Sequence, residues 1–146
     1  MATVELRFSA LPEHVRTARL VAAAVARRAG VDEAVLDEVR LAVGEACSRA
    51  VGLHESHGIA APVRVVLIED EKKFSIEVGD EVPGAGAAAA GGADAEGVGE
   101  SDAEGEDEMG LAVISGLVDD VEVTSGENGG RIRMSWPAHP APVVLP

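Results

Sequence analysis

The run VRVVLIEDEKKFSIEV, residues 63–78, decides the fold class. Residues 63–68 and 74–78 are rich in β-branched and other apolar side chains, and two acids, Asp70 and Glu71, lie between them. This pattern predicts two strands joined by a hairpin. Because a hairpin pairs its strands antiparallel, the sheet built on this run is expected to be mainly antiparallel.

Further strands are expected at both ends of the chain. Residues 3–8 (TVELRF) alternate between apolar and polar side chains, as a half-buried strand does. Residues 121–124 and 132–136 are predicted to form a closing hairpin, with a turn at Asn128-Gly129-Gly130.

Two long helices are predicted between the first strand and the hairpin. The first runs from Pro12 to a glycine stop at Gly30, and the second is capped by Asp32 and runs to about Leu53. Each has an apolar stripe at helical spacing. The stripes are Val15, Ala18, Ala22, Val25 and Ala29 in the first, and Val35, Val39, Ala42, Val43, Ala46 and Ala50 in the second. A short helix is expected over residues 109–118.

Residues 83–108 differ in kind from the rest of the chain. Their 26 positions hold 7 Gly, 8 Ala and 8 acidic residues, with no Lys or Arg. Such a segment cannot bury enough apolar surface to offset its ordering entropy, so we expect a flexible acidic lid loop. The expected organisation is one domain over residues 1–136 and a proline-rich tail over 137–146. The fold class is α+β, a two-layer α/β sandwich whose helices cover one face of the sheet.

Charge and cysteine content exclude several classes of protein. The net charge of −14 disfavours binding to nucleic acid and to anionic membranes. A single cysteine, Cys47, excludes an internal disulfide and a zinc site built from cysteines, and it is expected in the core. The four histidines show no metal-ligand spacing, so no metal site is predicted. No signal or membrane-spanning segment is evident, and a cytoplasmic protein is expected.

Three places hold polar residues that periodicity does not explain. Glu45 and Arg49 lie four apart on the second helix, where an ion pair is the simplest interpretation. Asp80 follows a strand directly and is followed by Pro83 and Gly84, which favours a turn. The third place is Met109-Gly110-Leu111, where a loop meets a predicted helix.

Taken in order, the three places resemble the Bergerat fold of the histidine-kinase and Hsp90-like ATPases. Within it, the chain is most similar to the bacterial anti-sigma factor serine kinases. The runs that carry this likeness are Phe8-Ser9-Ala10-Leu11-Pro12, Ala18-Arg19, Leu41-Ala42-Val43-Gly44-Glu45-Ala46, Met109-Gly110-Leu111 and Gly129-Gly130.

The resemblance implies roles for these residues. Glu45 would be the catalytic base toward a Ser or Thr hydroxyl of a partner, and Asp80 would bind the adenine amino group of ATP, which the family uses with Mg²⁺. The other residues that the resemblance places at the nucleotide are Arg49, Gly84, Met109, Gly110, Leu111 and Arg131. Arg16 and Arg19 would contact partners, namely a sigma factor and an anti-anti-sigma factor with a STAS domain. A homodimer through the sheet is possible in such a family, with residues 63–68 as a candidate edge.

The sequence departs from the family at the nucleotide motifs. Arg49 stands where the family has an Mg²⁺-binding Asn, Val82 replaces a glycine, Arg131 replaces a Thr, and Asp107-Glu108 replaces Ser-Gly. The family's helical His aligns with Leu53, so His54 is expected to face elsewhere. A like-charge contact near phosphate at ~4 Å costs about 1–4 kcal/mol. We therefore expect ATP to bind weakly or not at all.

Three functions remain open from the sequence. The first is an anti-sigma-factor-like regulator that sequesters its partner, supported by the basic helix face of Arg16, Arg19 and Arg27 in an acidic chain. The second is an active serine/threonine kinase that phosphorylates an anti-anti-sigma factor. The third is an unrelated adaptor, which a structure without a cleft between the second helix and residues 80–110 would favour.

Overall fold

The two predicted hairpins form most of the sheet in the computed structural model, which describes residues 2–83, 111–118 and 120–139. Strand β2 (Val63–Glu69) pairs with β3 (Lys73–Asp80), and β4 (Asp120–Gly126) pairs with β5 (Gly129–Pro137). The N-terminal strand β1 (Ala2–Phe8) joins β2. All these pairings are antiparallel, as expected.

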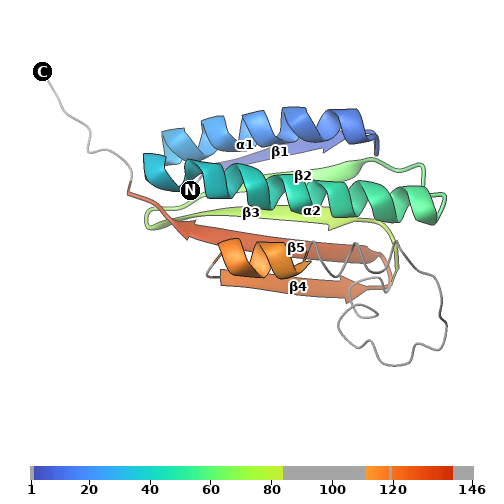
Figure 1. Cartoon of the computed structure of the whole chain (residues 1–146). Coiled ribbons are helices and arrows are strands. Elements are labelled where there is room, and N and C mark those ends of the chain that lie inside the picture. Colours follow the sequence, from blue (N-terminus) through green and yellow to red (C-terminus); the bar gives the residue numbers. More distant parts are fainter. Residues whose placement is uncertain (1, 84–110, 119, 140–146) are drawn as a thin grey trace, which may run out of the picture.

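The strand order is β1-β2-β3-β5-β4, so the last strand along the chain lies inside the sheet (Figure 1). Pairing of β3 with β5 places Asp80 beside Gly130. The edge strands are β1 and β4. The expectation that residues 63–68 offer an edge for a second copy is therefore wrong, because β1 and β3 occupy both sides of β2.

The helices begin and end close to the predicted positions. Pro12 opens a 3-10 turn (Pro12–His14) that leads into α1 (Val15–Ala29), and Gly30 ends α1 in the left-handed conformation with φ 96°. Asp32 caps a second 3-10 turn (Glu33–Val35) by accepting from the backbone N–H of Ala34, and α2 (Leu36–Ser56) follows. Residues 111–117 form the third helix.

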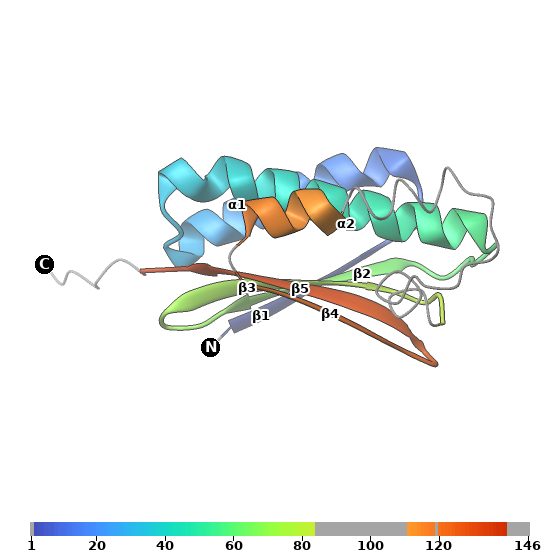
Figure 2. The ribbon, with the colours of Figure 1, turned by 60° about the horizontal axis from the view of Figure 1, so that its bottom comes forward.

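The helices lie in one layer against a single face of the sheet (Figure 2). Side chains on that face of the strands alternate with outward ones and form the core together with α1 and α2. Phe74 and Trp136, paired across β3 and β5, stack at 6.3 Å between ring centroids. Cys47 is fully buried in this core, as predicted. None of the described helices is both long and apolar enough to cross a membrane.

The fold continues beyond residue 136, where the sequence placed its end. Pro137 still belongs to β5, and Ala138 is fully buried. The backbone N–H of Ala138 donates to the carbonyl of Lys72, and that of His139 donates to the carbonyl of Gly30. These bonds tie β5 to the β2–β3 turn and to the end of α1.

Candidate functional site

Asp80 is the last residue of β3, and its side chain is only 6% exposed. One carboxylate oxygen accepts hydrogen bonds from the backbone N–H of Val82 at 2.8 Å and from that of Gly130 at 3.3 Å. The bond to Val82 is a local turn, as the sequence suggested, and the bond to Gly130 fixes the carboxylate against β5. Backbone donors thus hold a buried carboxylate at the end of β3, on the face of the sheet that the helices cover.

Two glycines of β5 leave room for this carboxylate. A Cβ on Gly130 would lie 2.9 Å from the second carboxylate oxygen of Asp80. A Cβ on Gly129 would lie 2.0 Å from the carbonyl oxygen of Asp80, and Gly129 has φ 124°. The turn, predicted at Asn128-Gly129-Gly130, lies at Glu127 and Asn128, so the two glycines belong to β5 and form one wall of the site.

His54 of α2 contacts the backbone directly after Asp80, although it was expected to face elsewhere. Asp80, Gly129, Gly130 and His54 are called the Asp80 corner below. The imidazole is fully buried, with Nε2 accepting from the backbone N–H of Glu81 at 2.9 Å and Nδ1 lying 2.9 Å from the carbonyl oxygen of Ala61. Since an N–H can only donate and a carbonyl can only accept, the proton resides on Nδ1. The expectation was wrong because α2 continues past Leu53 to Ser56 and packs its last turns on the end of β3.

Glu45 and Arg49 do not form the ion pair that their spacing suggested. Arg49 is only 7% exposed and Glu45 is half-buried, and no nitrogen of Arg49 lies within 4.0 Å of a Glu45 oxygen. The pair fails because the Arg49 side chain is drawn into the interior while Glu45 remains at the surface. Within the described residues, the buried Nε of Arg49 has no hydrogen-bond partner. Arg49 is thus a buried cation beside the core.

The remaining candidate residues lie apart from one another. Leu111 opens the helix 111–117 and packs against the core, whereas Gly84, Met109 and Gly110 lie outside the described residues. So do Asp107 and Glu108. Val82, two residues after Asp80, is almost fully buried.

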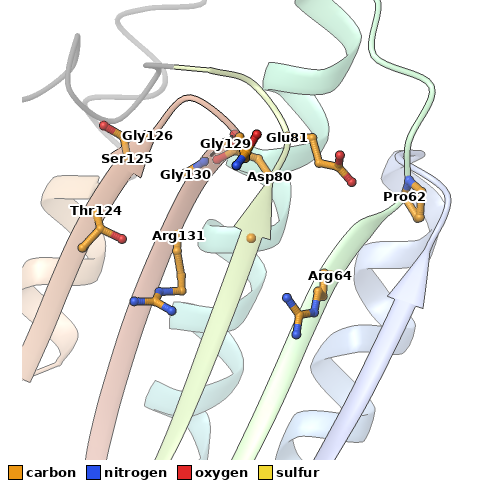
Figure 3. A pocket seen from close by; sticks show the side chains of 12 residues that line it. Pro62, Arg64, Asp80, Glu81, Thr124, Ser125, Gly126, Gly129, Gly130 and Arg131 are labelled. Carbon is orange, nitrogen blue, oxygen red and sulfur yellow. Dashed lines mark hydrogen bonds between the residues drawn. The ribbon is translucent and has the colours of Figure 1, made fainter.

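Arg131 lies on the opposite face of the sheet from Asp80. It pairs with Gly79 and is exposed, whereas its neighbours Gly130 and Ile132 are buried on the helix-covered face. Successive side chains of a strand point to opposite faces, so Arg131 points away from the helices (Figure 3). The structure therefore brings Asp80 together with Gly130 and His54, whereas the side chain of Arg131 extends from the other face of the sheet.

The side chain of Arg19, from α1, packs on Gly44 of α2, the residue before Glu45. A Cβ built on Gly44 would meet the Arg19 Cδ at 2.9 Å, so the stem of this arginine passes over Gly44. Burial raises the pKa of the Cys47 thiol to about 12, and the nearby Arg19 charge opposes that rise. Arg16 and Arg19 are exposed, and within the described residues neither takes part in a salt bridge, whereas Arg27 pairs with Glu33.

Two exposed leucines, which the sequence interpretation missed, lie on the same helices. Leu20 of α1 is 57% exposed and Leu41 of α2 is 53% exposed, the highest values among the large apolar side chains of the described residues. Both lie off the apolar stripes of their helices. That offset is the sequence signal that could have identified them.

The described residues fit a nucleotide base better than they fit a metal ion. The fixed carboxylate of Asp80 retains an oxygen that accepts no hydrogen bond within the described residues, and it could accept one from an amino group. For Mg²⁺, the described parts of the chain contain no group of three or more His, Cys, Asp or Glu side chains. One helical turn after Glu45, α2 carries a cation, Arg49.

The fold and this corner define a class of protein. The sequence matches the histidine kinase-like ATPase domain family over residues 8–136, so the chain belongs to that family. A search of curated proteins found no match.

Among solved structures, the chain is similar to the crystal structure of the RsbU and RsbW domains of Rv1364c from Mycobacterium tuberculosis. The TM-score is 0.67 at 16% sequence identity, with 100% of this chain and 35% of that one covered. This likeness confirms the predicted Bergerat-type fold. The chain spans about a third of the length of that protein.

Proposed function

We propose that this protein is an anti-sigma-factor-like regulator that acts by binding a partner through one face of α1 and α2. The partner is a sigma factor or an anti-anti-sigma factor with a STAS domain. Membership of the histidine kinase-like ATPase family supports this proposal, as does similarity to a structure that includes an RsbW domain. The motif around Arg19 supports it independently.

The observation that carries the proposal is the position of Arg19 over Gly44 of α2. Within the described residues Arg19 forms no salt bridge, and an exposed guanidinium of this kind can bind a partner's carboxylate without first breaking one. Leu20 and Leu41 add exposed apolar surface on the same pair of helices. Arginine next to exposed apolar side chains is typical of the residues that dominate binding energy in protein interfaces.

In this proposal, ATP binds weakly or not at all. Arg49 is a buried cation with no acceptor atoms, so it cannot ligate Mg²⁺. The Val82 side chain fills space beside Asp80, and one oxygen of Asp80 is already occupied by two backbone donors. Arg49 could pair with a phosphate group, which leaves some affinity for nucleotide without metal.

The second candidate is an active serine/threonine kinase. The half-buried Glu45 and the intact corner of Asp80 and Gly130 favour it. Glu45 would then be the general base, within hydrogen-bond reach of a partner hydroxyl.

Partner binding is tested with matched arginine variants. Purified sigma factors and STAS proteins from the same genome are titrated against wild type, Arg19→Gln and Arg27→Gln. We expect the Arg19 variant to bind about tenfold more weakly, since one interfacial charge-assisted contact is lost, and the Arg27 variant to bind within about twofold of wild type. Equal affinities for all three proteins would contradict the proposed docking face.

Enzymatic activity is tested separately. Calorimetry with Mg·ATP is expected to show a Kd weaker than about 100 μM, or no binding. Transfer of labelled phosphate to a bound partner is expected to be absent for wild type and for Glu45→Ala. Micromolar Mg·ATP affinity together with transfer that Glu45→Ala abolishes would establish the kinase instead.

A further inference from the structure

The helix-free face of the sheet carries a cleft of about 390 Å³ at the end where Asp80 lies. Its floor is Gly79 of β3, and Arg64 of β2 and Arg131 of β5 stand on either side. Both arginines pair with Gly79 in the strand register, so all three residues share one row and one face. Figure 3 shows the two guanidinium groups on the same side of the sheet, flanking β3.

The lining of this cleft is rich in hydrogen-bond donors and poor in apolar side chains. Besides the arginines it includes two hydroxyls, one amide and further glycines: Thr124, Ser125, Asn128, Gly126, Gly129 and Gly130. The lining side chain that is both large and apolar is Pro62. A cleft of this kind suits a small ligand that carries several acceptor oxygens.

The arginines around the cleft are only partly neutralised. Glu5 is shared by Arg7 at 2.6 Å and Arg64 at 3.2 Å. Glu77 is shared by Arg133 at 3.3 Å and Arg131 at 3.7 Å. Four guanidinium groups thus share two carboxylates, which leaves two positive charges uncompensated within this set. Asp80 and Glu81, which also line the cleft, bring the local sum to zero, in contrast to the net charge of −14 for the whole chain.

Two acids also line the cleft, and neither pairs with its arginines. The carboxylate of Asp80 is turned back to the N–H groups of Val82 and Gly130. Glu81 is exposed at the rim, its side chain points toward Pro62 in Figure 3, and it lies beyond 4.0 Å from the nitrogens of Arg64 and Arg131. Neither acid forms an ion pair with the two arginines, although Glu81 lowers the positive potential from the rim.

We propose that this cleft binds a phosphomonoester dianion between Arg64 and Arg131. A phosphate dianion carries the two negative charges that the set lacks, and its oxygens project in several directions, so both guanidinium groups and the hydroxyls can donate to it. A carboxylate has one charge and two oxygens in one plane. The cleft shares Asp80, Gly129 and Gly130 with the Asp80 corner, but its two arginines lie on the helix-free face of the sheet, and the proposal does not depend on the proposed function.

Matched variants test the proposal, because each carboxylate is shared by one arginine that lines the cleft and one that does not. Wild type, Arg64→Gln and Arg131→Gln are titrated by NMR in phosphate-free buffer of low ionic strength. Arg7→Gln and Arg133→Gln are the controls. The probes are inorganic phosphate and two short peptides of the same sequence, one with serine and one with phosphoserine.

We expect inorganic phosphate to bind wild type, with shifts centred on Gly79 and Gly130, and each cleft variant to bind about tenfold more weakly. The controls should weaken binding less than the cleft variants do, because Arg7 and Arg133 contribute charge to the set but do not line the cleft. Glu81→Gln should strengthen binding, since it removes a negative charge from the rim. Tighter binding of the phosphoserine peptide than of phosphate identifies a phosphorylated side chain as the source of the ligand. Binding of inorganic phosphate but not of the phosphoserine peptide would contradict a phosphomonoester ligand.

Three results would overturn the site. The first is no saturable binding of phosphate or phosphopeptide up to about 10 mM. The second is equal weakening by all four arginine variants, which indicates general charge attraction. The third is unchanged phosphate binding with an altered oligomeric state in the cleft variants, which makes the face a contact between copies. Thermal unfolding of each variant verifies that it is folded.

Discussion

Gly129 lies against the main chain of Asp80 so closely that a Cβ on the glycine would be 2.0 Å from the Asp80 carbonyl oxygen. The contact joins the beginning of β5 to the end of β3, at the point where the Asp80 carboxylate is fixed. The candidate site is therefore built by two strands that are far apart in the sequence.

Replacing Gly129 by alanine should destabilise the fold. The substitution adds a clash with the Asp80 carbonyl to a backbone that has φ 124°, so we expect a loss of about 2–4 kcal/mol in the free energy of unfolding. The control is Gly126→Ala in the same hairpin, where a Cβ meets nothing within 4 Å and little change is expected. Urea denaturation measures both, and equal stabilities would disprove the contact.

His54→Leu should loosen the corner around Asp80. The variant fills a similar volume but leaves the N–H of Glu81 and the carbonyl of Ala61 without partners, which costs about 1–3 kcal/mol for each group that stays buried. Hydrogen exchange of the Glu81 amide should accelerate. Replacing the exposed His57 by leucine is the control, and the Glu81 amide should be unaffected by it. Unchanged exchange in His54→Leu would show that the imidazole does not hold this backbone.

Gly44→Ala should weaken partner binding without unfolding the protein. The new methyl group meets the flexible stem of Arg19 at 2.9 Å and displaces it, while alanine favours the helix by about 1 kcal/mol. Gly52→Ala on the same helix is the control, because a Cβ there meets nothing within 4 Å. Melting temperatures and partner affinities are compared for both. A Gly44→Ala protein that binds the partner as tightly as Gly52→Ala would separate Arg19 from the docking surface.

Cys47 should make stability fall at alkaline pH. Burial raises the pKa of its thiol from 9.0 to about 12, so above pH 9 the unfolded chain loses the thiol proton while the folded chain keeps it. Deprotonation then favours unfolding by about 1.4 kcal/mol per pH unit, and the stabilising contribution present below pH 9 is lost as pH rises toward 12. The sequence contains no tyrosine, so few other side chains titrate between pH 9 and 12.

Denaturation of wild type and Cys47→Ala between pH 8 and 12 measures this contribution. The wild-type free energy of unfolding should decline more steeply than that of the variant above pH 9. Parallel curves would mean that the thiol ionises equally well in both states.

Arg49→Asn should increase affinity for Mg·ATP at least tenfold. The variant removes a buried cation and supplies an amide oxygen that can coordinate a divalent ion. For wild type, ATP in the presence of EDTA should bind no more weakly than Mg·ATP, because the Arg49 guanidinium can form an ion pair with a phosphate group without a metal ion. Calorimetry with and without Mg²⁺ measures both effects. A wild-type affinity that depends strongly on Mg²⁺ would contradict this assignment.

Local signals predicted most of the secondary structure. The glycine stop at Gly30, the cap at Asp32 and the two hairpins lie where the sequence placed them, because each depends on residues close together in the chain. The insertion of β5 beside β3 was not evident, since it depends on contacts between segments about 50 residues apart.

The candidate site was less predictable for a related reason. Arg131 is one residue from Gly130, and a shift of one residue along a strand exchanges one face of the sheet for the other. Arg49 and His54 are polar residues on a helix, and periodicity gave no reason to bury them. Their burial depends on how α2 packs on the sheet. The resemblance predicts that this helix lies on the sheet, but it does not predict which of its polar residues are buried.

The position of β5 has a consequence for protein synthesis. The ribosome releases β1, both long helices and the β2–β3 hairpin well before residues 129–137 emerge. Until then β3 lacks a neighbour on one side, and the carboxylate of Asp80 lacks its glycine partner. A nascent chain therefore has the proposed docking face of Arg16 and Arg19 available before the residues around Asp80 are complete.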